Sequence, residues 1–142
     1  MEAMLKDVAN EIGHKSLPDR ELQPSWNIKP TQDLYVITNE SIKIASWGLI
    51  APWSQSNTEA LKSQSKAINA RSETVQEKPT FRNAFKKSRC LVPATGYYEW
   101  STELGQYKPR QPIYVSRDDS KLLFFAGIYD RWSSPQGETM ES

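Results

Sequence analysis

The sequence predicts one α+β domain, built mostly from short antiparallel strands with a few short helices. Short runs rich in β-branched and aromatic residues are separated by brief polar connections, a pattern typical of hairpins. Helical periodicity is confined to short stretches. The length of 142 residues is enough for one hydrophobic core and short for two.

The composition is that of a globular protein, because 37% of the residues are hydrophobic and 25% are charged. Eighteen basic and seventeen acidic residues give a net charge near +1, so a nucleic-acid footprint would have to be local. Cys90 is the only cysteine, which excludes an internal disulfide and fits a reducing cytoplasm. It lies in an apolar strand, which favours a buried, unreactive thiol. His14 is the only histidine, so we expect no zinc site. No run is long and apolar enough for a membrane span.

The N-terminal part predicts a helix followed by a long loop. Apolar residues recur with helical spacing between Leu5 and Ile12, and Gly13 follows as a stop. We expect this helix to face the core and His14 to complement the helix dipole rather than to catalyse. Residues 15–32 form a polar, proline-bearing loop that contains the short sequence WNIKP.

A hairpin is predicted from Asp33–Thr38 and Ile42–Trp47, which are rich in β-forming residues. The next stretch, WGLIAPW, places Trp47 and Trp53 around a glycine and a proline. The two indoles either close one end of the sheet or offer a stacking face to a base. Core packing is favoured for Trp47 and exposure for Trp53.

Residues 54–65 are predicted to be a surface loop or a weak helix, and the polar cluster NARSET follows at 69–74. NARSET lies between expected core elements, so one interpretation is a buried polar cluster kept for a ligand. The alternative is a helix cap, with Ser72 or Thr74 opening a turn.

A short helix is predicted for the sequence PTFRNAFKKS, because proline is favoured at helix starts. It ends in the densest basic patch of the chain, Lys86, Lys87 and Arg89. The patch is either a solvated helix end favoured by the dipole or, with Arg82 and Arg71, a contact for a phosphate backbone.

The sequence RCLVPATGYYEW, residues 89–100, predicts two short strands joined by a break containing proline and glycine. Alternation along the second strand places Tyr97 and Glu99 on one face and Tyr98 and Trp100 on the other. Aromatic neighbours would desolvate the Glu99 carboxyl group, which suits a proton-transfer role. The alternative, favoured by the strand pattern alone, is a solvated glutamate.

The last third is predicted to contain a turn at 104–109 and a hairpin of Ile113–Ser116 with Leu122–Tyr129. The apolar run LLFFAGIY favours a central, buried strand. Residues 132–142 are predicted to be a polar tail with nothing to pack against.

Four motifs in order resemble the SRAP family, the SOS-response-associated peptidase-like proteins that are also described as abasic-site processing proteins. They are WGLIAPW (47–53), NARSET (69–74), FRNAFKKSRCLVPATGYYEW (81–100) and FFAGIYDRW (124–132). The resemblance implies mostly antiparallel strands curled into a pseudo-barrel. It also suggests that residues 1–142 are a single SRAP-like domain, incomplete at both ends.

The resemblance implies a protein of bacterial type in the cytoplasm, associated with the nucleoid. It implies binding of single-stranded DNA that contains abasic sites. We expect no cofactor, and nothing in the sequence demands more than a monomer. Family members link covalently to the abasic sugar through an N-terminal cysteine, whose amine and thiol form a thiazolidine; the amine is nucleophilic because its pKa lies near 8. Autoproteolytic release and self-reversal are also attributed to the family.

The family motifs also assign roles to individual residues. Glu99 and Asn69 match catalytic residues, which assist proton transfer and hold the abasic sugar. Arg71 matches a phosphate contact, a role suited to its planar donor fork. The remaining candidates for DNA binding are Asn27 and Pro30 of an N-x-x-P motif, Trp47, Trp53, Arg82, Lys86 and Lys87.

The sequence departs from the family pattern at three places. Position 2 is Glu2 where the family has cysteine, and Ser54 stands where many relatives have an aromatic residue. The family's catalytic histidine belongs to a later segment, which His14 does not match. The hypotheses are therefore a covalent abasic-site enzyme in the complete family member, a non-covalent single-stranded DNA-binding module, or an incomplete domain with neither activity.

Overall fold

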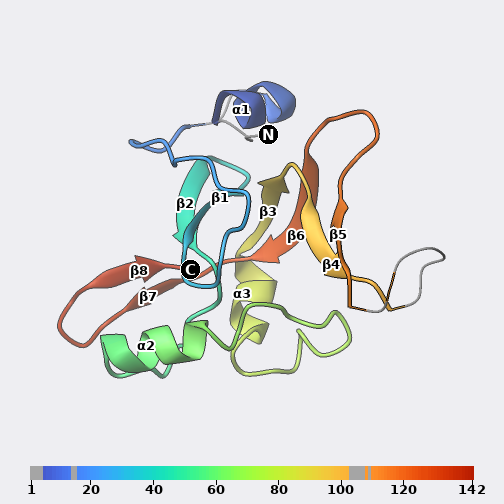
Figure 1. The fold of residues 1–142 in the computed structure, drawn as a ribbon. Coiled ribbons are helices and arrows are strands. Elements are labelled where there is room, and N and C mark those ends of the chain that lie inside the picture. Colours follow the sequence, from blue (N-terminus) through green and yellow to red (C-terminus); the bar gives the residue numbers. More distant parts are fainter. Residues whose placement is uncertain (1–4, 14–15, 103–107, 109) are drawn as a thin grey trace.

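The computed structural model describes residues 5–13, 16–102, 108 and 110–142. Its elements, shown in Figure 1, are α1 (Leu5–Ile12), β1 (Asp33–Ile37), β2 (Ile42–Ser46), α2 (Asn57–Gln64), α3 (Arg82–Lys87), β3 (Arg89–Ala94), β4 (Tyr97–Trp100), β5 (Pro112–Val115), β6 (Leu123–Ile128), β7 (Arg131–Ser133) and β8 (Thr139–Glu141).

The predicted α+β class with antiparallel strands is confirmed. The described strands form a four-stranded sheet in the order β2-β1-β3-β6 and two separate pairs, β4-β5 and β7-β8. All of these pairings are antiparallel. The described strands do not close into the expected pseudo-barrel, because β2 and β6 are the two edges of the largest sheet.

The predicted N-terminal helix and hairpin are both confirmed. In α1, Leu5 and Val8 are buried against β1 and β2, and burial of each apolar side chain stabilises the fold by about 2 kcal/mol. The helix is followed by Gly13 at φ 83°, a left-handed conformation that glycine adopts without strain. In the hairpin, Ile37 lies opposite Ile42. His14 lies outside the described residues.

Within the segment 54–65, residues 57–64 form the helix α2, whose start is capped. The Ser56 hydroxyl accepts the backbone N–H of Glu59 at 3.3 Å, and the Glu59 carboxylate accepts the N–H of Gln55 at 2.9 Å. These contacts satisfy backbone donors that a helix start otherwise leaves unpaired. Within the described ranges, no helix is long and apolar enough to cross a membrane.

The predicted hairpin of 113–116 with 122–129 is wrong. β5 pairs with β4, so that Tyr114 lies opposite Tyr98, while β6 pairs with β3. The similar patterns of these two consecutive strands favour pairing with each other, but the connection after β5 crosses from one sheet to another. β6 is also an edge strand rather than a central one, and its Phe125 is exposed. The turn predicted at 104–109 falls almost wholly outside the described residues.

The C-terminal segment is not an unpacked tail. β7 and β8 form a hairpin whose Trp132 is only 5% exposed and packs against Ile50 and Ala60. The Trp132 indole N–H donates to the Ser54 carbonyl at 3.2 Å. The buried Ser142 hydroxyl accepts the N–H of Ile50 at 3.1 Å. These partners are distant in sequence, so local polarity did not reveal the packing.

Candidate nucleic-acid interface

Trp47 joins three of the predicted site segments. Its carbonyl accepts the N–H of Thr31 at 2.8 Å, and its own N–H donates to the Gln32 carbonyl at 2.8 Å. Its indole N–H donates to the carbonyl of Ile68 at 3.0 Å. The loop carrying the N-x-x-P motif, the WG segment and the start of NARSET are therefore held side by side by one residue.

Gly48 allows this arrangement because a larger residue would collide with α2. Its φ is +106°, and an added Cβ would lie 2.3 Å from the backbone oxygen of Gln64. The buried Gln64 amide donates to the Ser46 carbonyl at 3.2 Å and to its hydroxyl at 2.6 Å. The end of α2 is therefore fixed against the end of β2, directly before Trp47.

Asn69 and Arg71 are exposed side chains on an anchored backbone. The Arg71 carbonyl accepts the N–H groups of Thr74 and Val75, at 3.1 and 2.9 Å. Val75 is buried in a core cluster with Leu49. The prediction of a buried polar cluster is thus wrong for these two side chains.

In the alternative for NARSET, the expected turn is present from Ser72 onward, but the helix cap is wrong. The residues after Arg71 form turns, and the next helix, α3, starts only at Arg82. The N-cap of α3 is Phe81, which makes no side-chain capping bond. The polar side chains of Asn69 and Arg71 are therefore free to meet a ligand from solvent.

Trp47 and Trp53 differ in exposure, as predicted. Trp47 is half-buried and bonded through its indole, whereas Trp53 is exposed. Ser54, which replaces the aromatic residue of many relatives, is buried and its carbonyl receives the Trp132 indole. Trp53 is therefore the indole that can stack on a base.

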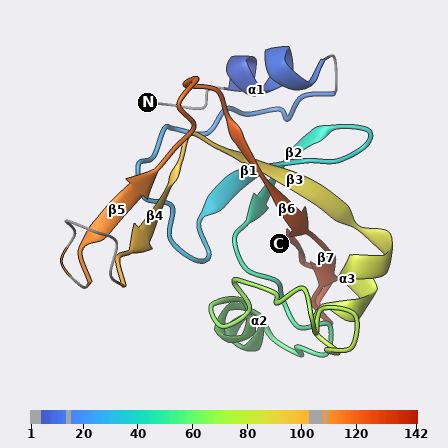
Figure 2. The same ribbon diagram turned by 90° about the vertical axis from the view of Figure 1, so that its right-hand side faces the viewer.

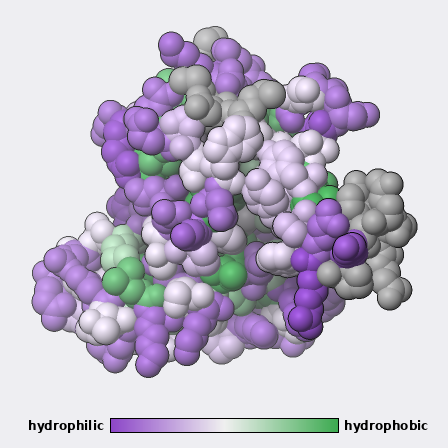
Figure 3. All heavy atoms as spheres, in the orientation of Figure 1, coloured by the Kyte–Doolittle hydropathy of each residue, from purple (hydrophilic) through white to green (hydrophobic). Residues whose placement is uncertain are grey.

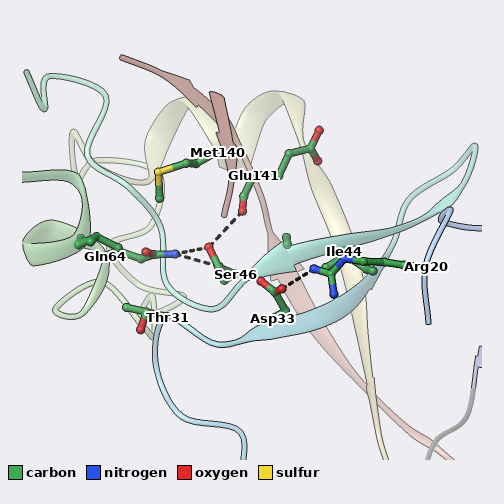
Figure 4. A pocket seen from close by; sticks show the side chains of 10 residues that line it. Arg20, Thr31, Asp33, Ile44, Ser46, Gln64, Met140 and Glu141 are labelled. Atoms are coloured by element: carbon green, nitrogen blue, oxygen red, sulfur yellow. Dashed lines mark hydrogen bonds and ion pairs between the residues drawn. The ribbon is translucent and has the colours of Figure 1, made fainter. Parts of the chain in front are cut away.

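Two hollows adjoin the segment that follows the N-x-x-P motif, and Thr31 and Asp33 line both of them. Asn27 is exposed, Pro30 is half-buried, and Thr31 has a φ of 72°, which is uncommon for a non-glycine residue. A cleft of about 470 Å³ adjoins Thr31, Ser46 and Gln64, as Figure 4 shows. A second hollow, of about 340 Å³, is lined by residues between Leu22 and Asp33.

The residues of the larger cleft were missed by sequence reasoning. They include the ion pair of Arg20 with Asp33, at 2.5 Å, and Glu141 from the C-terminal hairpin (Figure 4). Ser46 connects β2 to the C-terminal hairpin, because its hydroxyl donates to the Glu141 carbonyl at 3.2 Å. These residues come from segments far apart in the chain, so no local motif could have indicated the cleft.

Glu99 is not the desolvated acid that the sequence suggested. All four residues of β4 are exposed, and Glu99 Oε1 accepts the N–H of Trp100 at 3.2 Å. The alternative of a solvated strand glutamate is the correct one for this chain. Tyr97, on the same face as Glu99, meets the Phe125 ring edge-on at 5.5 Å, so this face is turned toward β6.

The structure therefore groups only part of the predicted site. Asn27, Pro30, Trp47 and Asn69 belong to segments joined around Trp47, whereas Glu99 lies on the separate β4-β5 sheet. Figure 2 shows this sheet standing to one side of the four-stranded sheet.

The basic residues of α3 are exposed, in agreement with both interpretations of the patch. Arg82, Lys86 and Lys87 all lie on this helix with exposed side chains. Arg89 differs, because its Nε–H donates to the Phe85 carbonyl at 2.9 Å and its guanidinium lies over the Phe85 ring. Arg89 is thus tied to the helix, while the other three can meet a phosphate.

Cys90 is a buried structural thiol, as predicted. Burial raises its pKa to about 11, which keeps it protonated at neutral pH. It lies opposite Gly127 on β6, where an added Cβ would come within 2.9 Å of its sulfur. In the part of the chain that the structure describes, no group of three or more His, Cys, Asp or Glu side chains could hold a metal ion.

Comparison with known proteins identifies the family. A family model described as SOS response associated peptidase (SRAP) matches residues 1–142. The chain belongs to the SRAP family. It is 37% identical over 128 residues to the abasic site processing protein YoqW of Bacillus subtilis, covering 87% of this chain and 54% of that protein. It is 31% identical over 151 residues to the abasic site processing protein HMCES of Xenopus tropicalis, covering 84% of this chain and 44% of that protein.

The fold of this SRAP chain is also found in solved structures. A crystal structure of a protein from Bacteroides thetaiotaomicron matches with a TM-score of 0.77 and 32% sequence identity, covering 99% of this chain and 63% of that one. The chain spans about half the length of the relatives that it matches.

Proposed function

We propose that this SRAP chain binds single-stranded DNA at abasic sites, and that the surface around Trp47 is the binding surface. The observation that carries the proposal is the set of hydrogen bonds by which Trp47 joins the N-x-x-P loop to the backbone before Asn69. The names of the relatives, which describe abasic site processing, support DNA as the partner.

Each group on this surface has chemistry suited to one part of the ligand. The exposed Arg71 guanidinium can form paired hydrogen bonds with a phosphate. The exposed Trp53 indole offers a face to a base, and such stacking contributes about 1–3 kcal/mol per base. The Asn69 amide can donate to and accept from the hydroxyl groups of an open sugar. Arg82, Lys86 and Lys87 on α3 offer further positive charges for phosphate groups.

Covalent capture is proposed for the complete family member and not for the 142-residue polypeptide. A thiazolidine requires an amine and a thiol on one residue: the amine condenses with the sugar aldehyde with loss of water, and the thiol then adds to the resulting imine carbon. Position 2 is Glu2, and Cys90 is buried, protonated and without a free amine. The polypeptide is therefore expected to bind without crosslinking.

In a complete family member, the glutamate that matches Glu99 is proposed to move the proton that ring opening and imine formation require. Its exposure in this chain leaves the carboxylate accessible to a ligand from solvent. Autoproteolytic and self-reversal activities belong to the same proposal for a complete family member.

The experiment measures binding of the 142-residue chain to an abasic single-stranded oligonucleotide over a range of salt concentrations. Arg71→Ala is expected to weaken binding and to reduce the slope of log affinity against log salt by about one phosphate contact. Arg117→Ala is the control with the same change of net charge, since Arg117 is paired with Asp119 in another part of the chain. An unchanged slope for Arg71→Ala would remove its phosphate role.

The same oligonucleotide tests the covalent step. After incubation, heating in denaturant should leave no DNA-linked band with this chain, whereas an adduct that survives heating would overturn the assignment of a non-covalent module. Failure of the chain to bind single-stranded DNA at all would refute the proposed function itself.

A further inference from the structure

The larger cleft contains a buried hydrogen-bond acceptor that the chain leaves unpaired. Gln64 is fully buried and lines the cleft, and Figure 4 shows its side chain reaching toward Ser46. Its Nε2 donates to the Ser46 carbonyl, which can only accept, so the orientation of the amide is fixed. Among the described residues, none donates a hydrogen bond to Gln64 Oε1. Buried polar atoms are normally paired, so this oxygen indicates a ligand that donates a hydrogen bond.

The charged groups of the cleft argue against an ionic ligand. Asp33 is paired with Arg20. The Glu141 carboxylate is paired with Arg131. Because both carboxylates already have a cationic partner, a free cation would gain little. An anion would bring its oxygen atoms against the Gln64 carbonyl oxygen, which only accepts. The ligand group that fits is therefore neutral and carries N–H donors.

The walls of the cleft suit a flat ring. Ile44 of β2, Leu61 of α2 and Met140 of β8 line it with apolar side chains. In Figure 3, green hydrophobic atoms lie between the C-terminal hairpin and α2. The volume of about 470 Å³ is within the range of small-molecule sites, roughly 300–1,000 Å³. A flat ring with apolar faces and N–H donors on its edge would fill such a space.

A nucleobase with an amino group has both properties. Unstacked bases present apolar faces and are recognised through the hydrogen-bonding groups on their edges. Adenine, cytosine and guanine carry an exocyclic amine that projects from the ring and can reach a buried acceptor. Thymine has no such amine, and its ring N–H lies between two carbonyl oxygens, which would meet the Gln64 oxygen. The cleft therefore favours the three amino-bearing bases over thymine.

The cleft adjoins the surface proposed to bind DNA. Thr31, which lines the cleft, follows Pro30 of the N-x-x-P motif and donates its backbone N–H to the Trp47 carbonyl at 2.8 Å. Arg20 also lines the cleft, and 60% of its side chain is exposed, so N–H groups not used by Asp33 can bind a phosphate. We propose that the larger cleft is a subsite for one amino-bearing nucleobase of the bound strand, whose amine donates to Gln64 Oε1. The inference rests on the proposed function and adds base selectivity to it.

The test compares short single-stranded oligonucleotides that contain one abasic site and differ only in their other bases. These bases are all adenine in the first strand, all purine, which is adenine without its amine, in the second, and all thymine in the third. The 142-residue chain should bind the adenine strand about tenfold more tightly than the purine strand, as expected for one buried hydrogen bond. The thymine strand should bind no better than the purine strand. Adenine and purine have rings of the same size, so both can stack on Trp53.

A matched pair of variants locates the selectivity. Gln64→Met removes the acceptor but keeps a side chain of similar length, so its affinities for the adenine and purine strands should become equal. Gln136→Met makes the same change on an exposed residue of the C-terminal hairpin and should preserve the difference. Circular dichroism checks that both variants fold. The unmodified chain gives a second readout, because the side-chain amide NMR signal of Gln64 should shift further with the adenine strand than with the purine strand.

Three results would overturn the inference. Equal affinities of the unmodified chain for the adenine and purine strands, or equal shifts of the Gln64 signal, would leave DNA binding intact and assign the cleft to solvent alone. A preference for adenine that persists in folded Gln64→Met would place the selectivity elsewhere on the protein. Failure to bind any of the strands would refute the proposed function and this inference with it.

Discussion

Replacement of Gly48 by alanine tests whether the approach of α2 to the WG segment holds the candidate site together. A residue with a side chain at φ +106° is strained by about 1–2 kcal/mol. The added Cβ would also lie 2.3 Å from the Gln64 carbonyl oxygen, which is backbone and cannot rotate away. Forcing this separation adds about 1–3 kcal/mol, so we expect a total loss of about 2–5 kcal/mol.

Gly137→Ala provides the matched control for backbone strain alone. Gly137 also has a positive φ, +90°, but nothing lies within 4 Å of an added Cβ. Urea denaturation followed by circular dichroism should therefore give a loss of about 1–2 kcal/mol for Gly137→Ala. If Gly48→Ala costs no more than Gly137→Ala, the close approach of α2 does not fix the WG segment.

The remaining predictions concern one residue each. Trp47→Phe should lose about 1–2 kcal/mol of stability, because the Ile68 carbonyl loses its hydrogen-bond donor. It should also speed amide exchange at residues 67–71. Trp53→Phe should have neither effect, and equal effects of the two substitutions would contradict the role of the Trp47 indole bond. Burial raises the pKa of Cys90 from 9.0 to about 11, so alkylation at pH 9 should be at least about tenfold slower in the folded chain than in urea. The Cys90 thiol loses its proton at lower pH in the unfolded chain than in the folded one, so the free energy of unfolding should fall as pH rises from 9 to 11. Cys90→Ser should remove that dependence. A free energy of unfolding that does not change with pH in the unmodified chain would argue against a buried thiol. In a complete relative, Glu99→Gln should slow adduct formation while keeping most DNA binding, and equal rates would exclude the carboxylate from proton transfer.

The sequence by itself determined the elements whose signals are local. The apolar spacing in α1, its stop at Gly13 and the β1-β2 hairpin all depend on residues a few positions apart. The ordered motifs likewise identified the SRAP family, because the identity and spacing of residues can be compared without knowing their contacts. The preference of Trp53 for exposure also followed from its immediate neighbours.

Only the tertiary structure decided how distant segments meet. Trp132 donates a hydrogen bond to the Ser54 carbonyl, 78 positions away, and Ser46 donates one to the Glu141 carbonyl, 95 positions away. The segment predicted to be a polar tail is therefore part of the core and of the larger cleft. Glu99 is solvated although Tyr97, on the same face of β4, packs against Phe125 of β6. Strand pairing and burial are set by long-range packing, and neither is encoded in the pattern of a single strand.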